Sequence, residues 1–404
     1  MEKENSILDQ IIMNNKAQEV ASLDAVEIIN KLFNELTDRE QDVLMRRFGL
    51  HGKGKETLEN IGNIHSLTRE RIRQIETTSV KKLRKLQKLD EYISNLKEVI
   101  VQLLEEHGGL MERDYLLHTL VNFSVGELKA SDEDILIHKH YLDFMINKLL
   151  DKDFELVIGS RHFKHSYKLK YKELEHLEEI VNELHLKIKE EKMVFKTEEL
   201  IEKIYDLETY LGHKEKLQAE NNIDISSVLG SDLYEEKTGF INENKVLFTL
   251  LKAAKKIEQN KFGHWGVHNW REIKPKTIND KIYLVLKNNA EPLHFVEIAE
   301  KINNIAFDQK KANPATVHNE LILDNKYVLV GRGLYGLKEW GFKKGTVADV
   351  IVDILNASEA SLSRDEIIEK VLDMRMVKKA TVILALMNKE RFDKIDGKYK
   401  LKQA

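Results

Sequence analysis

The feature that most restricts the fold is a unit that recurs along the chain. Three stretches end alike, each with an apolar segment that carries Gly and aromatic residues and suits a β-hairpin, at 154–169, 327–337 and 392–401. Two or three amphipathic helical patterns precede each of them. A local echo supports the repeat, because His264-Trp-Gly-Val-His-Asn-Trp270 matches Leu334-Tyr-Gly-Leu-Lys-Glu-Trp340 at an offset of 70. This spacing is too long for a solenoid and indicates small domains in series.

The predicted fold class is mainly α, a multidomain array of helix-turn-helix and winged-helix units with small β-hairpin wings, because three helices followed by a hairpin is the winged-helix plan. The expected parts are an N-terminal helical segment at 1–35, a helix-turn-helix at 36–89, a winged-helix-like domain at 90–172, an acidic helical or winged-helix-like domain at 173–274, and winged helices at 275–342 and 343–404. The weak periodicity of 217–239 predicts a loop insertion there.

Composition excludes several classes of function. The chain contains no cysteine, so disulfides, thiolate zinc sites, iron–sulfur clusters and cysteine nucleophiles are ruled out. No apolar run approaches the ~18 residues that span a bilayer, and the first residues lack the basic and apolar regions of a signal peptide. We therefore expect no membrane partner and a cytoplasmic location.

The net charge of −4 hides a strong asymmetry. Residues 36–89 hold 13 Lys/Arg against 7 Asp/Glu, a net +6, whereas residues 90–274 hold 26 against 36, a net −10. The N-terminal segment stands at −4, and the two C-terminal units stand at +1 and +3. Because a polyanion partner needs a basic surface, nucleic-acid binding is expected within the first hundred residues.

The basic segment carries the capping signals of three short helices. Thr37 with Glu40 forms a capping-box pattern, and the helix that it opens should end at Gly49. Thr57 and Thr68 are the predicted N-caps of a second and a third helix, separated by a tight turn. Three capped helices at this spacing indicate a helix-turn-helix.

The third predicted helix separates an apolar face from a polar one. At about 100° per residue, one narrow stripe holds Ile72, Ile75, Ser79, Leu83 and Leu86. The opposite face holds Glu70, Arg73, Gln74, Thr77, Lys81, Arg84, Lys85 and Lys88. Such a surface suits the major groove, because Arg pairs with guanine, Gln with adenine and Glu with cytosine, while the basic end meets phosphates. The alternative is a solvated face on an ordinary helix.

The run from 36 to 86, and above all Thr68-Arg-Glu-Arg-Ile-Arg-Gln-Ile-Glu76, resembles region four of the sigma-70 family. The resemblance implies a bacterial transcription factor, nucleoid-associated, that docks on the β-flap of the RNA polymerase core and reads the −35 promoter element of double-stranded DNA. With the helix geometry, it predicts DNA contacts from Thr68, Arg69, Glu70, Arg71, Arg73, Gln74, Thr77, Lys81, Arg84, Lys85 and Lys88. It also predicts a polymerase-binding first helix with Val43, Leu44, Arg46, Arg47 and Phe48.

One departure limits this resemblance. A sigma factor that opens DNA also has an aromatic-rich region that captures the melted −10 element, whereas residues 1–35 contain a single aromatic residue, Phe33. Capture of an unpaired strand needs such rings, because bases stack on them. Autonomous promoter melting is therefore not expected, and the chain should act as an accessory to polymerase.

A second stretch, 276–342, resembles the HARE helix-turn-helix, a winged-helix family that includes the N-terminal domain of the RNA polymerase delta subunit. The resemblance is carried by Pro292-Leu-His-Phe-Val-Glu-Ile-Ala299 and by Val330-Gly-Arg-Gly-Leu-Tyr-Gly-Leu-Lys-Glu-Trp340, among others. It implies a transcription-associated role through either DNA or protein contacts. The last unit has its third helix near 378–389, and DNA binding and scaffolding are both open for it.

No catalytic residue, metal site or cofactor is predicted, and the chain is expected not to be an enzyme. The sequence has no phosphate loop, hydrolase elbow or dinucleotide fingerprint. The histidine pairs at 138–140 and 162–165 are read as surface residues. A nuclease centre around Asp224 and Glu235–Lys237 is a weak third hypothesis. The main alternative is an interaction scaffold that docks on polymerase without reading DNA sequence.

Overall fold

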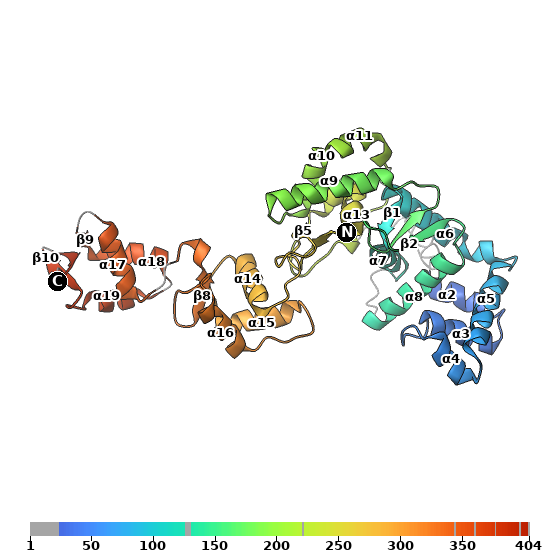
Figure 1. Cartoon of the computed structure of the whole chain (residues 1–404), viewed down its shortest axis with the longest axis horizontal. Coiled ribbons are helices and arrows are strands. Elements are labelled where there is room, and N and C mark those ends of the chain that lie inside the picture. The colour runs from blue at the N-terminus through green and yellow to red at the C-terminus, as the bar shows by residue number, and fades with distance from the viewer. Residues whose placement is uncertain are drawn as a thin grey trace, which may run out of the picture. The chain divides into compact units, whose positions relative to one another are not determined.

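The computed structural model describes residues 24–125, 131–219, 222–342, 345–358, 361–375, 377–395 and 397–402. Most of the predicted N-terminal segment therefore lies outside the described residues. The chain forms two compact units, unit 1 up to residue 259 with 263–268, and unit 2 with 260–262 and 269 onward. Their described parts are mainly α with antiparallel sheets of two or three strands, which confirms the predicted fold class (Figure 1).

Unit 1 begins with α2 (Ala25–Phe33), α3 (Asp38–Phe48), α4 (Leu58–His65) and α5 (Arg69–Arg84). Thr37 and Glu40 form the predicted capping box of α3, which ends at Gly49 with a φ of 72°. Thr57 and Thr68 cap α4 and α5 as expected. Local capping signals thus set the starts of all three helices. Helices α3, α4 and α5 are called the head below.

The next part of unit 1 contains α6 (Leu89–Glu106), β1 (Leu110–Glu112), α7 (Arg113–Val125), α8 (Asp132–Lys148), β2 (Phe154–Val157) and β3 (Ser166–Leu169). The strands β2 and β3 form the predicted antiparallel hairpin, with Phe154 opposite Leu169. The strand β1 pairs with the other edge of β3, so the sheet order is β1–β3–β2. The sequence did not predict β1, because three residues are too few to show an alternating pattern.

The last part of unit 1 contains α9 (Glu175–Glu191), α10 (Thr197–Tyr205), α11 (Glu208–His213), η1 (Lys214–Leu217), η2 (Ser226–Val228), α12 (Thr238–Glu243), α13 (Lys245–Ala253), β4 (Ile257–Gln259) and β5 (Trp265–Val267). The strands β4 and β5 are antiparallel, and Phe195 makes a further bridge to Trp265. Between 217 and 239, the described residues hold only η2 and the ends of η1 and α12. This agrees with the weak periodicity of that stretch.

Unit 2 uses one order of elements twice. The first set is α14 (Ile278–Asn289), β6 (Leu293–His294), α15 (Phe295–Ile305), α16 (Pro314–Leu323), β7 (Tyr327–Leu329) and β8 (Leu334–Leu337), followed by η3 (Lys338–Trp340). The second set is α17 (Val347–Ala357), β9 (Leu362–Ser363), α18 (Arg364–Met374), α19 (Lys379–Leu386), β10 (Phe392–Ile395) and β11 (Lys398–Leu401). Their sheet orders, β6–β8–β7 and β9–β11–β10, repeat that of β1–β3–β2.

The core of unit 1 joins parts that the sequence placed in separate domains. One cluster of buried side chains extends from Ala25 of α2 through Leu44 of α3 and Leu83 of α5 to α6, α8 and Leu169 of β3. A smaller cluster within the head consists of Val43, Ile61, Ile72 and Ile75. Figure 1 shows α8 beside α2 and α3. The sequence changes from basic to acidic near residue 90, but the buried core continues across that point. The finer six-part division stays a prediction.

Candidate nucleic-acid interface

The turn between α4 and α5 sets the angle at which α5 is presented. Ser66 ends α4 in the left-handed conformation, with a φ of 55°. A Cβ atom on Gly62 would lie 2.6 Å from the carbonyl oxygen of Leu67, so only glycine fits this approach. The Thr68 hydroxyl then accepts a hydrogen bond from the Arg71 amide at 3.2 Å. These contacts leave the first turn of α5 open to solvent.

The inner face of α5 agrees with most of the predicted stripe. Ile72, Ile75, Ser79 and Leu83 are buried, and Val80 joins them although the sequence did not place it there. Leu86 is only half-buried, because α5 ends at Arg84. The predicted helix was therefore too long at its C-terminal end. Lys85 is its C-cap, and Lys88 is the N-cap of α6.

All the residues predicted to contact DNA are exposed. They are Thr68, Arg69, Glu70, Arg71, Arg73, Gln74, Thr77, Lys81, Arg84, Lys85 and Lys88. The structure thus places them at the surface of α5 and the short segment after it. Exposure gives them access to a ligand, and the role of each one stays a prediction.

Two pairs organise the N-terminal half of this surface. The Arg73 guanidinium donates to both carboxylate oxygens of Glu70, from Nε at 2.9 Å and from Nη2 at 2.7 Å. The Arg71 Nη1 atom donates to the Gln74 Oε1 atom at 3.2 Å. The bond from Arg73 lowers the pKa of Glu70, and the bond to Glu70 raises the pKa of Arg73. Glu70 therefore fixes the orientation of the Arg73 guanidinium, which keeps several N–H donors unused.

The basic end of the surface divides into free and engaged cations. Lys81, Lys85 and Lys88 have no ion-pair partner within the described residues. Arg84 differs, because its Nε atom donates to the Lys148 carbonyl at 2.6 Å and its Nη2 atom lies 2.9 Å from Asp151. Arg84 thus holds α5 against the end of α8. Its side chain therefore bonds to residues outside the head, unlike the three lysines.

The residues predicted to bind polymerase lie mainly inside the protein. Val43 and Leu44 are fully buried, Val43 in the small cluster of the head and Leu44 in the large core of unit 1. The Phe48 ring packs 4.8 Å from the ring of Phe144 on α8. These three side chains therefore hold α3 against its neighbours, Val43 against α4 and α5 and Phe48 against α8.

Arg46 and Arg47 are more exposed than Val43 and Leu44, as expected, but both are engaged. Arg46 lies 2.8 Å from Asp42 and 3.0 Å from Glu56. Arg47 lies 3.3 Å from Glu76 and donates to the Glu56 carbonyl at 3.0 Å. These contacts tie α3 to the segment before α4 and to α5. Replacing either arginine would therefore also test the stability of the head.

Asp143 of α8 is a buried anchor that the sequence did not reveal. Its carboxylate accepts from Arg113 at 2.9 Å, from the Tyr167 hydroxyl at 2.6 Å and from Lys55 at 3.0 Å. Burial alone would raise its pKa, but these donors lower the pKa to about 2. His140, also on α8, donates to the Gly49 carbonyl at 2.8 Å. The partners lie up to 91 residues apart, so no local pattern marks them.

The described residues offer neither a metal site nor a membrane-spanning helix. No group of three or more His, Asp or Glu side chains there could hold a metal ion. No helix in that part of the chain is long and apolar enough to cross a membrane. The residues of the nuclease hypothesis are used elsewhere: Asp224 caps Ser226, and Lys237 pairs with Glu198.

Comparison with known proteins identifies the head. Residues 32–85 match the family described as sigma-70, region 4. The RNA polymerase sigma factor SigA of Clostridium acetobutylicum is 39% identical over 99 residues, which are 23% of this chain and 26% of that protein. SigA of Lactococcus lactis subsp. cremoris is 50% identical over 58 residues, 14% of this chain and 16% of that protein. No solved structure matches the chain.

The predicted resemblance to sigma-70 region 4 is therefore confirmed for residues 32–85. The chain spans no more than 26% of the length of these two curated relatives. The resemblance of 276–342 to the HARE family stays a prediction.

Proposed function

We propose that the chain is a sigma-factor-like, DNA-binding transcription factor that places α5 in the major groove of a −35-like promoter element. The observation that carries the proposal is the exposed surface of α5 within a sigma-70 region 4 domain. That surface joins paired recognition side chains to unpaired lysines. Phosphate contacts would fix the register of the helix, and the paired side chains would read base edges.

The Glu70–Arg73 pair gives this surface a preference for guanine. With its Nε atom and one Nη2 hydrogen bonded to Glu70, the guanidinium keeps its Nη1 hydrogens for a guanine O6 or N7 atom. Glu70 acts here as a positioning residue, and its carboxylate also repels phosphates that approach out of register. Gln74, one turn from Glu70, offers an amide suited to adenine.

Selection from a randomised pool with the full chain tests this proposal. We expect the full chain to select a preferred DNA sequence. Glu70→Ala should weaken the base preference at one or two positions of that sequence. Its affinity for random DNA should stay equal or rise, because a negative charge is lost. The matched control is Glu59→Ala, an exposed acid in the first turn of α4. A pool that returns no preferred sequence would contradict sequence reading.

We also propose that the head docks on the β-flap of the bacterial RNA polymerase core. Since Val43 and Leu44 are buried, the apolar contact is assigned to Ile64 of α4, which is 52% exposed. Ile64→Ser should abolish co-purification with core polymerase while circular dichroism stays unchanged. Leu136→Ser, at an exposed apolar position of α8, is the control. Co-purification that survives Ile64→Ser argues against this face.

The interaction scaffold remains the second candidate, because α16 carries no Lys or Arg and exposes apolar side chains. We propose that the two sets in unit 2 are winged helices, the first of HARE type, supported by their shared element and sheet order. Polymerase binding without a preferred DNA sequence would make the scaffold the better description. Both functions place the protein in the cytoplasm with the nucleoid, and neither needs catalysis.

A further inference from the structure

Unit 1 contains a cavity of about 330 Å³ that the DNA-reading role does not use. It lies between α7, α13 and the segment 228–236, with Lys139 of α8 also at its wall. A cavity of this volume is at the small end of ligand sites and suits a molecule of amino-acid size. Its wall holds side chains of both charges, among them Glu112, Glu236 and Lys252.

Lys252 supplies a positive charge to this cavity. Its ammonium donates to the Gln259 Oε1 atom at 2.8 Å and lies 5.1 Å from the centre of the Phe248 ring. No carboxylate of the described residues lies within ion-pair distance of it. Burial lowers the pKa of this lysine to about 8. The ammonium therefore has donors left for an anionic group that would favour its charged form.

Tyr115, which also lines the cavity, carries a second unused donor. Its hydroxyl is buried and has no hydrogen-bond partner in the part of the chain that the structure describes. Its ring packs edge-on against Phe248, with centroids 5.9 Å apart, so Tyr115 and Lys252 flank one aromatic ring. Buried hydroxyls are usually paired, and an unpaired one marks a place for a missing acceptor.

The opposite charge comes from two partly buried acids. Glu112 accepts from the Tyr115 amide at 2.7 Å. One oxygen of Glu236 accepts from Gln259 at 2.8 Å and from the Thr197 hydroxyl at 3.1 Å, and the other has no partner among the described residues. Burial raises the pKa of both carboxyl groups. A cation placed between them would favour their ionised forms.

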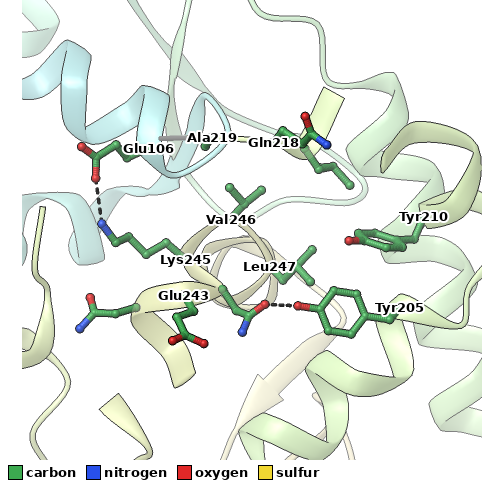
Figure 2. A pocket seen from close by; sticks show the side chains of 12 residues that line it. Glu106, Tyr205, Tyr210, Gln218, Ala219, Glu243, Lys245, Val246 and Leu247 are labelled. Carbon is green, nitrogen blue, oxygen red and sulfur yellow. Dashed lines mark hydrogen bonds and ion pairs between the residues drawn. The ribbon is translucent and has the colours of Figure 1, made fainter. Parts of the chain in front are cut away.

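A larger cavity in unit 1, of about 430 Å³, differs in the state of its lysine (Figure 2). Figure 2 shows Lys245 reaching Glu106, and the two lie 2.8 Å apart. The Tyr205 hydroxyl is likewise bonded to Asn244. The lysine of that cavity is therefore already paired, whereas Lys252 has no carboxylate of the described residues within ion-pair distance.

We propose that the 330 Å³ cavity binds a small zwitterion of amino-acid size, with its carboxylate on Lys252 and Tyr115 and its ammonium on Glu112 and Glu236. A ligand of one sign would leave the groups of the other sign desolvated and unpaired, which is unfavourable. A zwitterion pairs both sets at once. The site is independent of the DNA-reading surface of α5.

The first test is thermal denaturation of the full chain with each standard amino acid in turn. At least one should raise the unfolding temperature with a saturable dose response, since a ligand that binds the folded state stabilises it. The amine formed by removing its carboxylate and its N-acetyl derivative should both fail. If no amino acid shifts the transition, or if the amine alone works equally well, the zwitterion site is wrong.

The second test removes one hydroxyl. Tyr115→Phe deletes a group without a partner, so the unfolding temperature of the free protein should not fall. The Kd of the amino acid found above, measured by calorimetry, should rise at least about tenfold. Tyr171→Phe is the control, because its hydroxyl bonds to Glu105 at the surface. Lys252→Met should also abolish binding. Unchanged affinity in Tyr115→Phe and Lys252→Met together would overturn the proposal.

Discussion

Helices α5 and α16 are each the third of a group of three helices, yet they offer opposite surfaces. Six of the sixteen residues of α5 are Lys or Arg, whereas α16 has none. On α16, Ile322 and Leu323 are 59% and 79% exposed. The third helix therefore presents a cationic surface in the head and an apolar one in unit 2. The element order shows how a helix is presented, and its exposed side chains decide which partner it suits.

The two regions also differ in how charge holds them together. In unit 1, Asp143 is buried among Arg113, Tyr167 and Lys55. In unit 2, the pair Asp349–Arg391, at 2.7 Å, has both side chains nearly half exposed. Water screens the exposed pair more strongly than the buried carboxylate. The following substitutions test both differences.

The largest effect is expected for Asp143→Asn. It removes the buried anion that Arg113, Tyr167 and Lys55 share, and the loss of these charge-assisted hydrogen bonds should cost about 3–5 kcal/mol of unfolding free energy. Hydrogen exchange in α3 and α8 measures the loss. Asp349→Asn, in the exposed pair, should change exchange in α17 only slightly. Similar effects in both variants would remove the contrast between the two regions.

The same carboxylate predicts a dependence on pH. Its pKa is lowered in the folded chain to about 2, so its contribution to stability is complete above the ordinary carboxyl pKa of about 4 and is lost as the pH falls toward 2. Acid titration should therefore loosen the contact between the head and α8. Asp143→Asn should flatten that part of the stability curve.

The second largest effect compares one residue type in two settings. Ile72 is fully buried in the small core of the head, so Ile72→Ala should cost about 2–4 kcal/mol. Ile322 of α16 is mostly exposed, so Ile322→Ala should stay within about 0.5 kcal/mol. Urea unfolding of the full chain separates them. A large loss in Ile322→Ala would mean that α16 packs differently.

A third, smaller effect concerns base reading. Arg73→Ala should weaken binding to the preferred DNA by about ten- to a hundredfold, with less effect on random DNA. Asn319→Ala, at an exposed position of α16, should leave both affinities unchanged. Fluorescence anisotropy with the selected and a scrambled duplex measures both. Equal losses on the two duplexes would show that Arg73 contacts only phosphates.

The smallest effect is expected for Lys85→Ala. It removes one phosphate contact, so all sequences should weaken alike and the slope of log K against log salt should fall by about one. Lys379→Ala, at the start of α19, is the matched cation in unit 2. If Lys379→Ala lowers the slope as much as Lys85→Ala, both units bind DNA, and the contrast between a cationic head and an apolar unit 2 is wrong.

Local patterns predicted much of the fold and the exposed face of the site. The caps at Thr37, Thr57 and Thr68 and the three hairpins formed as expected, because neighbouring residues decide them. Non-local contacts were missed. Arg84 bonds to a carbonyl 64 residues away, and the two-residue strands β6 and β9 exist only through their partners. Periodicity shows which face of a helix is apolar, but it cannot show which element packs against that face.

The attachment of α8 to the head has a mechanical consequence. His140 holds the Gly49 carbonyl, Asp143 holds Lys55, and the Lys148 carbonyl holds Arg84, so three points along one helix fasten the head. These contacts reach the head at Gly49, at Lys55 and at Arg84, so they restrain its rotation on α8. If α5 enters a major groove as proposed, the bound duplex will also set the direction of α8 and of the sheet packed on it. The orientation of the promoter DNA would thereby determine the orientation of the rest of unit 1.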